Sequence, residues 1–156
     1  MEALAAIVFD LLFLIIVLII LIIIASFFII RDLKIELNKV LDIRSRFHIE
    51  VRKIVNLIYN VHSFTYLEPF TKVIIKNLPH EEKKILLRNI DSAFQEINLE
   101  DKNNKYIIET YENLQAIRRE RDALILGYNQ KISIFPFSFY AKIMKLKNYE
   151  LYTEKE

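Results

Sequence analysis

The sequence predicts an all-α protein in which one N-terminal transmembrane helix precedes an elongated antiparallel bundle of three long helices and one short helix. Three observations support this fold class. The first residues form a long apolar run, apolar residues then recur every three to four positions, and no convincing stretch alternates with a period of two. The same pattern divides the chain into an anchor at 1–30, a bundle at 31–136 and an amphipathic tail at 137–156.

The predicted membrane anchor covers residues 11–30, because Ser26 is the only polar residue among them. Twenty helical residues span about 30 Å, the hydrocarbon thickness of a bilayer. The alternative, a cleaved signal peptide, needs basic residues before a shorter apolar core, and no Lys or Arg precedes Arg31. We therefore expect the segment to stay in the membrane, from Leu11 through Ile20 to Ile30.

The basic residues predict the orientation of the anchor. Arg31 and Lys34 follow the span directly, and further Lys and Arg residues come after them. The positive-inside rule then places the N-terminus outside and residues 31–156 in the cytoplasm, with the chain crossing the cell membrane once. The lipid bilayer is thus the first expected partner.

Two apolar stripes predict the long helices of the bundle. The first lies beyond the span and contains no Pro or Gly between Arg31 and Glu68, so the transmembrane helix is expected to continue into it. Pro69 and Pro79 predict a short helix at about 69–77 and a longer one at 79–97. The polar run at 98–104 predicts a turn, and Pro136 ends a last helix at about 104–135.

Each stripe contains one arginine, Arg44 in the first and Arg121 in the second. Their apolar members are expected to pack inside the bundle or between copies of the chain: Phe47, Val51, Ile54, Ile58, Leu114, Leu124, Tyr128 and Ile132. Arg118, Arg119 and Arg121, together with Glu120 and Asp122, are expected to form a solvated and partly paired face.

Composition excludes several function classes. Without cysteine there is no disulfide framework and no thiolate metal site, and one glycine is too few for a glycine-rich phosphate loop. A net charge of +2 does not indicate nucleic-acid binding. His48 and His62 are two heptads apart, about 21 Å along one helix face, and cannot share a metal unless the protein oligomerises. His80 and the two acids after it suit the start of a helix, and the sequence shows no set of three or four converging ligands. We therefore predict no catalytic residue, no cofactor and no metal, and a protein that is not an enzyme.

One stretch carries a family resemblance: Arg118, Tyr128, Asn129, Ile132, Phe135 and Pro136. In this order and spacing they resemble the C-terminal signature of the LemA family, and the similarity extends over about 99–152. Arg121-Asp122 stands where that family has its first Tyr-Asn pair, which makes the chain a divergent member. The resemblance implies a bacterial, membrane-anchored helical protein without an established enzymatic activity. Some relatives in the family are associated with membrane remodelling.

The tail combines aromatic and aliphatic residues with lysines: Phe137, Phe139, Tyr140, Lys142, Ile143 and Lys145. Such a segment lies at a lipid interface or folds back over the bundle. If the segments at 69–77 and 79–97 fold as separate antiparallel helices, the last helix returns to the membrane and brings the tail to lipid. If they stack as one kinked helix, the last helix points away from the membrane.

The sequence therefore leads to two hypotheses about function. In the first, the chain is a scaffold that self-associates into a homo-oligomer and organises the membrane. In the second, it is an adaptor or sensor whose cytoplasmic bundle binds a partner protein and transmits a signal through its unhinged first helix.

Overall fold

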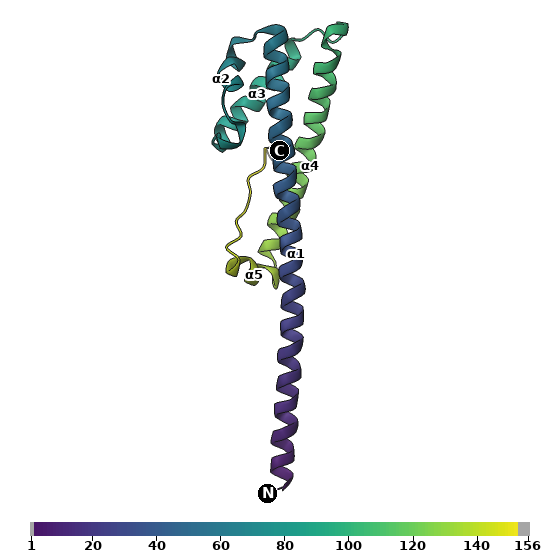
Figure 1. Ribbon diagram of the computed structural model, residues 1–156, viewed down its shortest axis with the longest axis vertical. Helices are drawn as coiled ribbons and strands as arrows, with labels where there is room; N and C mark the ends of the chain where they lie inside the picture. Colours follow the sequence, from purple (N-terminus) through teal and green to yellow (C-terminus); the bar gives the residue numbers. More distant parts are fainter. Residues whose placement is uncertain (1, 153–156) are drawn as a thin grey trace.

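A computed structural model describes residues 2–152 (Figure 1). Helix α1 runs from Glu2 to His62 without interruption, a length of about 90 Å at the rise of an α-helix. Its N-terminal half stands free, while its C-terminal half is covered by the rest of the chain (Figure 1). No strand occurs among the described residues, which confirms the all-α prediction. The predicted continuity of span and first bundle helix is confirmed as well.

The far end of α1 leads into a short irregular connection. It begins at Ser63, whose φ is +53°, and contains the 3₁₀ helix η1 (Thr65–Leu67), α2 (Glu68–Thr71) and the 3₁₀ helix η2 (Ile75–Asn77). The prediction of a single helix at 69–77 is therefore wrong.

The side chain of Arg52 accounts for this break. Its guanidinium donates to the carbonyl oxygens of Thr71 (2.7 Å) and Val73 (2.6 Å). A continuous helix would use these carbonyl oxygens for its own N–H groups. The chain is instead extended at Ile74 before η2 begins.

Two further long helices complete the bundle. Helix α3 (His80–Glu96) starts directly after Pro79, and α4 (Lys105–Ser133) follows the 3₁₀ turn η3 (Lys102–Asn104). The three long helices of the prediction are thus α1, α3 and α4. Helix α4 runs antiparallel to α1 and returns toward its free half (Figure 1).

The return of α4 decides where the tail lies. Helix α5 (Phe137–Ile143) lies beside α1 at the lower end of the bundle. The chain then turns at Lys145, whose φ is +54°, and runs back along the bundle to Tyr152 (Figure 1). We call residues 144–152 the return segment.

Two clusters of buried side chains hold the bundle together. The distal core contains the stripe residues of α1 from Ile43 to Ile58 and inward-facing residues of α3 and α4. The proximal core lies nearer the apolar half of α1, and its buried members are Leu33, Val40, Ile125, Tyr128, Ile132 and Ala141. Tyr152, at the end of the return segment, belongs to the distal core, so the tail reaches both clusters.

Hydrogen bonds hold the return segment against α4. The side-chain amide of Asn129 donates to the carbonyl oxygen of Tyr149 (2.7 Å) and accepts from the Tyr149 N–H (3.0 Å). Arg121 donates to the carbonyl oxygen of Glu150 (2.9 Å), and the Tyr152 N–H donates to the carboxylate of Asp122 (3.1 Å). These contacts give an irregular segment a defined position.

Candidate functional site

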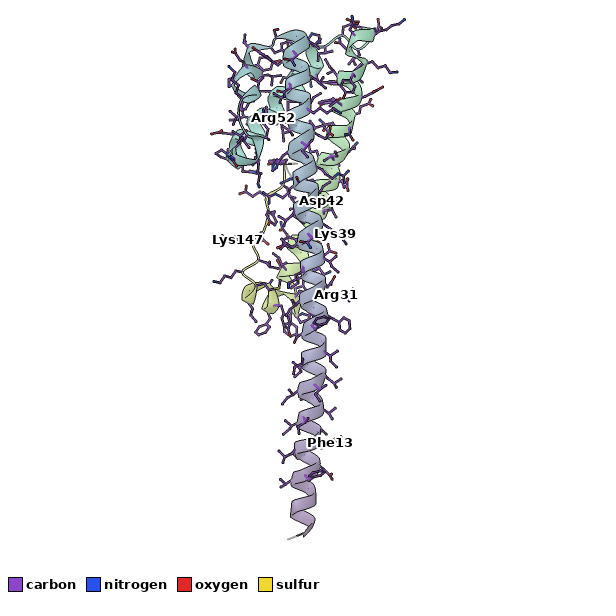
Figure 2. All side chains as sticks on the ribbon, in the orientation of Figure 1. Phe13, Arg31, Lys39, Asp42, Arg52 and Lys147 are labelled. Atoms are coloured by element: carbon purple, nitrogen blue, oxygen red, sulfur yellow. The ribbon has the colours of Figure 1, made fainter. Side chains whose placement is uncertain are left out.

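The apolar half of α1 carries the predicted anchor. Among the described residues, α1 is the only helix long and apolar enough to cross a membrane. Leu11 and Ile20 are exposed, Ile30 is half-buried, and Arg31 and Lys34 are exposed immediately beyond it. Figure 2 shows Phe13 on the free part of the helix and Arg31 at the level where the bundle begins.

Helix α5 and its flanking residues 135–146 form what we call the foot of the bundle. Phe137, Tyr140, Met144 and Leu146 pack against the proximal core. The Ser26 hydroxyl donates to the carbonyl oxygen of Ile22 (2.6 Å) and also contacts the Tyr140 hydroxyl. Because the single Ser26 proton is used on Ile22, Tyr140 donates the second hydrogen bond. The foot is thereby attached to the last turn of the predicted span.

The outer side of the foot is apolar and exposed. Phe135 is 80% exposed, Phe139 57% and Ile143 64%. Lys142 and Lys145 are exposed as well. Each of the two alternatives for the tail therefore applies to some of its residues. Phe137 and Tyr140 fold back on the bundle, while Phe139 and Ile143 face outward.

The foot lies close to the expected membrane boundary. Ser26 precedes Ile30 by four residues, or about 6 Å along the helix. The headgroup layer begins beyond Ile30, so the contact between Ser26 and Tyr140 lies within the end of the predicted span. An ion pair joins Lys131 of α4 to Asp32 of α1 (2.6 Å) just beyond this level. The foot is consequently positioned by contacts on both sides of Ile30.

The eight residues predicted to pack inside the bundle or between copies lie inside the chain's own cores. Phe47, Val51, Ile54, Ile58 and Leu114 are buried in the distal core, and Leu124 is half-buried beside it. Tyr128 and Ile132 are buried in the proximal core. These side chains contact their own chain, so a contact between copies has to use other residues.

The residues that resemble the LemA signature occupy the second half of α4 and its end. Arg118 pairs with Asp91 of α3 (3.2 Å), which ties the two helices together. Tyr128 and Ile132 are core residues, and Asn129 holds the return segment. Phe135 and Pro136 form the turn that leads into α5, with Pro136 directly before its first residue.

The predicted solvated face around Arg118, Arg119 and Arg121 is wrong for two of its members. Arg121 is 4% exposed and Asp122 is 6% exposed, and the two side chains form an ion pair. The guanidinium of Arg121 also lies 4.0 Å from the ring centroid of Tyr152. Arg121 stands in the apolar stripe of α4, so it faces α1 and the return segment instead of solvent.

A cluster of basic side chains was not identified from the sequence. Arg44 and His48 of α1 lie near Lys76 of η2, Lys83 of α3 and Arg121 of α4. In this cluster, burial and the neighbouring positive charges lower the pKa of His48 and of Lys83. The feature of the sequence that could have indicated this cluster is the arginine within each apolar stripe. Two cations at core-facing positions of antiparallel helices indicate that the helices meet around a polar site.

A groove of about 520 Å³ opens beside this cluster. Leu41, Ile49 and Ile74 supply apolar walls, and Arg44, His48 and Arg52 supply polar ones. Leu41, Ile49 and Ile74 are also exposed. The groove therefore offers both apolar surface and positive charge.

The three histidines have separate surroundings. His48 lies in the basic cluster, where burial and the charges of Lys83, Arg44, Arg121 and Lys76 lower its pKa from 6.5 to about 4. His62 contacts the side-chain oxygen of Asn104 (3.0 Å), and His80 stacks on Tyr152 and pairs with Glu150. In the part of the chain that the structure describes, no group of three or more His, Asp or Glu residues could hold a metal ion.

Comparison with known proteins gives no relative: no family model, no curated protein and no solved structure matches this chain. The resemblance to the LemA family stays a prediction.

The lowered pKa of His48 predicts an acid-dependent loss of stability. Above pH 6.5 the ring is neutral in the folded and unfolded chain alike, and it adds no pH dependence. Between pH 6.5 and about 4 the unfolded chain takes up a proton that the folded chain does not, so the free energy of unfolding falls as the pH falls. Thermal unfolding of detergent-solubilised protein should show a smaller drop over this range in His48→Gln than in the wild type.

His62→Gln is the matched control for this measurement, because it removes a histidine outside the basic cluster. It should keep the acid-dependent drop. Equal drops in the wild type and His48→Gln would contradict the assignment.

Proposed function

We propose that the chain is a single-pass membrane scaffold without enzymatic activity, which stands with its bundle on the inner face of the cell membrane and self-associates there. The observation that carries this proposal is the junction at Ser26 and Tyr140. At this point one helix leaves the apolar segment and enters the bundle, and the foot is attached beside it. A bundle held in this way cannot rotate freely relative to the anchor. This rigidity suits a scaffold, which positions neighbouring molecules through its own shape.

The proposed orientation places the N-terminus outside and the bundle in the cytoplasm. Arg31 and Lys34 support it through the positive-inside rule. Lys142 and Lys145 of the foot add exposed positive charge at the same end of the bundle. Lysines near the surface favour the leaflet that carries anionic lipid, which is the cytoplasmic one.

The proposed self-association uses the apolar half of α1. The side chains of residues 7–25 are exposed along the whole segment, and the chain's own bundle covers none of them. Parallel copies in one membrane can pack such helices side by side through close van der Waals contact. The resemblance to the LemA family supports the same proposal, because it implies membrane-anchored helical proteins of bacteria.

The placement of the foot predicts contact between Phe139 and lipid. The chain contains no Trp, so a single introduced Trp reports on its own surroundings. In vesicles that contain brominated lipid, the fluorescence of Phe139→Trp should be quenched severalfold more strongly than that of Tyr106→Trp. Tyr106 is exposed at the start of α4, at the opposite end of the bundle, and serves as the control. Equal quenching of the two variants would refute the lipid-facing foot.

Self-association predicts a defined oligomer in native membranes. Crosslinking in the membrane followed by mass analysis should give dimers or larger multiples of the 18.7 kDa chain without a second protein. Replacing three consecutive turns of the apolar half with polyleucine keeps it hydrophobic but changes its packing surface, and should reduce crosslinking severalfold. A monomer at all concentrations would remove the basis of the scaffold proposal.

The second candidate function is an adaptor or sensor, and the groove beside Leu41 and Ile49 favours it. A partner segment with apolar and acidic residues would complement this groove. The groove lies on α1, and no Gly or Pro separates it from the span, so a shift of the anchor is transmitted to its wall.

Inserting two glycines after Lys34 distinguishes the two candidates, because a flexible break stops transmission of a rotation or shift. An adaptor that signals through α1 should lose its cellular phenotype, while crosslinking through the span should persist. Insertion of two alanines is the matched control for the change in helix length. An unchanged phenotype in the glycine variant would count against the adaptor.

A further inference from the structure

A second cavity lies where the return segment crosses the bundle. It is a partly open space of about 300 Å³ between α1, α3, α4 and residues 148–152. Its walls carry four basic side chains, Arg44, His80, Lys83 and Arg121, and residues Tyr149 and Tyr152. Positive charge from three separate helices therefore converges on one partly open cavity.

The carboxylates near this cavity already have partners. Asp122 pairs with Arg121 and accepts from the backbone of Tyr152, and Glu150 pairs with His80 at 3.1 Å. Both acids therefore have a basic side chain as a partner. The charge of the remaining cations is not balanced by them.

Within residues 2–152, Lys83 and Arg44 are the cations of this cavity that lack an ion pair. Lys83 is only 8% exposed, and the hydrogen bond of its ammonium group goes to the carbonyl oxygen of Lys76 (3.0 Å). The guanidinium of Arg44 lies over the ring of Tyr149, 4.5 Å from its centroid. Among the described residues, neither side chain has a carboxylate within 4.0 Å. A buried ammonium group without a counter-charge is costly, so the fold keeps a site that an anion would stabilise.

The neighbouring positive charges act on Lys83. Burial lowers the pKa of Lys83, and the charges of Arg44 and Arg121 lower it further. A bound anion would act in the opposite direction, because an opposite charge nearby favours the protonated amine.

In the membrane position of the proposed function, on which this step rests, the height of the cavity identifies the source of the anion. Arg44 follows Ile30 by fourteen residues, or about 21 Å along α1. The headgroup region extends only about 5–7 Å beyond the hydrocarbon, so a lipid headgroup does not reach Arg44. The ligand has to come from solution.

We propose that this cavity binds a small soluble phosphate-bearing molecule. Arg44 and Lys83 supply its counter-charges, since a guanidinium matches two phosphate oxygens and an ammonium group acts as a point charge. This site is separate from the membrane contacts on which the proposed scaffold depends.

The test is titration of the full chain, purified in detergent, with pyrophosphate against sodium chloride at matched ionic strength, followed by calorimetry. Wild type should bind pyrophosphate in a saturable manner, and Lys83→Gln and Arg44→Gln should each bind it at least tenfold more weakly. Lys105→Gln removes an exposed lysine at the start of α4 and should bind like wild type. Without ligand, Lys83→Gln should melt at or above the temperature of wild type, because it removes an unbalanced buried charge.

Several results would overturn the proposal. One is a pyrophosphate titration of wild type that gives no more heat than the sodium chloride control. Another is binding of pyrophosphate by Lys83→Gln as tightly as by wild type. Glu154 and Glu156 follow Tyr152 in the sequence, so Glu154→Gln/Glu156→Gln tests whether the chain supplies its own anion. Binding by that variant but not by wild type would refute an external ligand. In lipid nanodiscs, loss of pyrophosphate binding on adding anionic lipid would identify a headgroup as the ligand and refute a soluble one.

Discussion

The packing of α4 along α1 is the contact on which the rest of the structure depends. The two apolar stripes meet over much of the length of α4 and bury side chains in both the distal and the proximal core. Because α4 runs antiparallel to α1, its end lies beside the apolar half of α1 and delivers α5 to Ser26. Burial of apolar surface supplies the stabilisation, and the direction of α4 decides what lies beside the apolar half of α1.

The contact between α1 and α4 also contains charged residues, and these residues line the basic cavity. Arg44 and Arg121 occupy positions in the stripes where an apolar residue would pack. Arg121 is compensated by Asp122 and by a backbone carbonyl of the return segment. Arg44 has the ring of Tyr149 and, within the part of the chain that the structure describes, no ion pair with an acid. A core that keeps two arginines gives up hydrophobic stabilisation and gains a polar cavity at the middle of the bundle.

The return segment joins the two ends of the molecule. It begins at the foot and ends at the basic cavity, and the side chain of Asn129 holds it between them. The part of the chain beside the proposed bilayer and the part that lines the cavity are therefore one continuous stretch of residues. A change in the position of this stretch would affect both places, which gives the tail a larger role than its length suggests.

Local pattern in the sequence was enough to predict the long helices. Uninterrupted apolar residues define the anchor, the spacing of three to four defines the long helices, and Pro79 and Pro136 define two of their ends. The short helix at 69–77 was predicted wrongly because Arg52, seventeen residues before Pro69, takes the carbonyl oxygens that the helix would need. No local pattern records such a contact.

Tertiary structure alone decided the position of the tail and the environment of the charges. The side chains of the foot follow a simple amphipathic pattern, and only the direction of α4 assigns Tyr140 to the bundle and Phe139 to the outside. Arg121 is buried because it faces α1, although its sequence neighbours suggested a solvated face. The sequence by itself determined which segments are helical, because helix formation depends on neighbours three or four residues away. Which charges meet depends on residues from three helices and the tail, and only the folded chain brings these together.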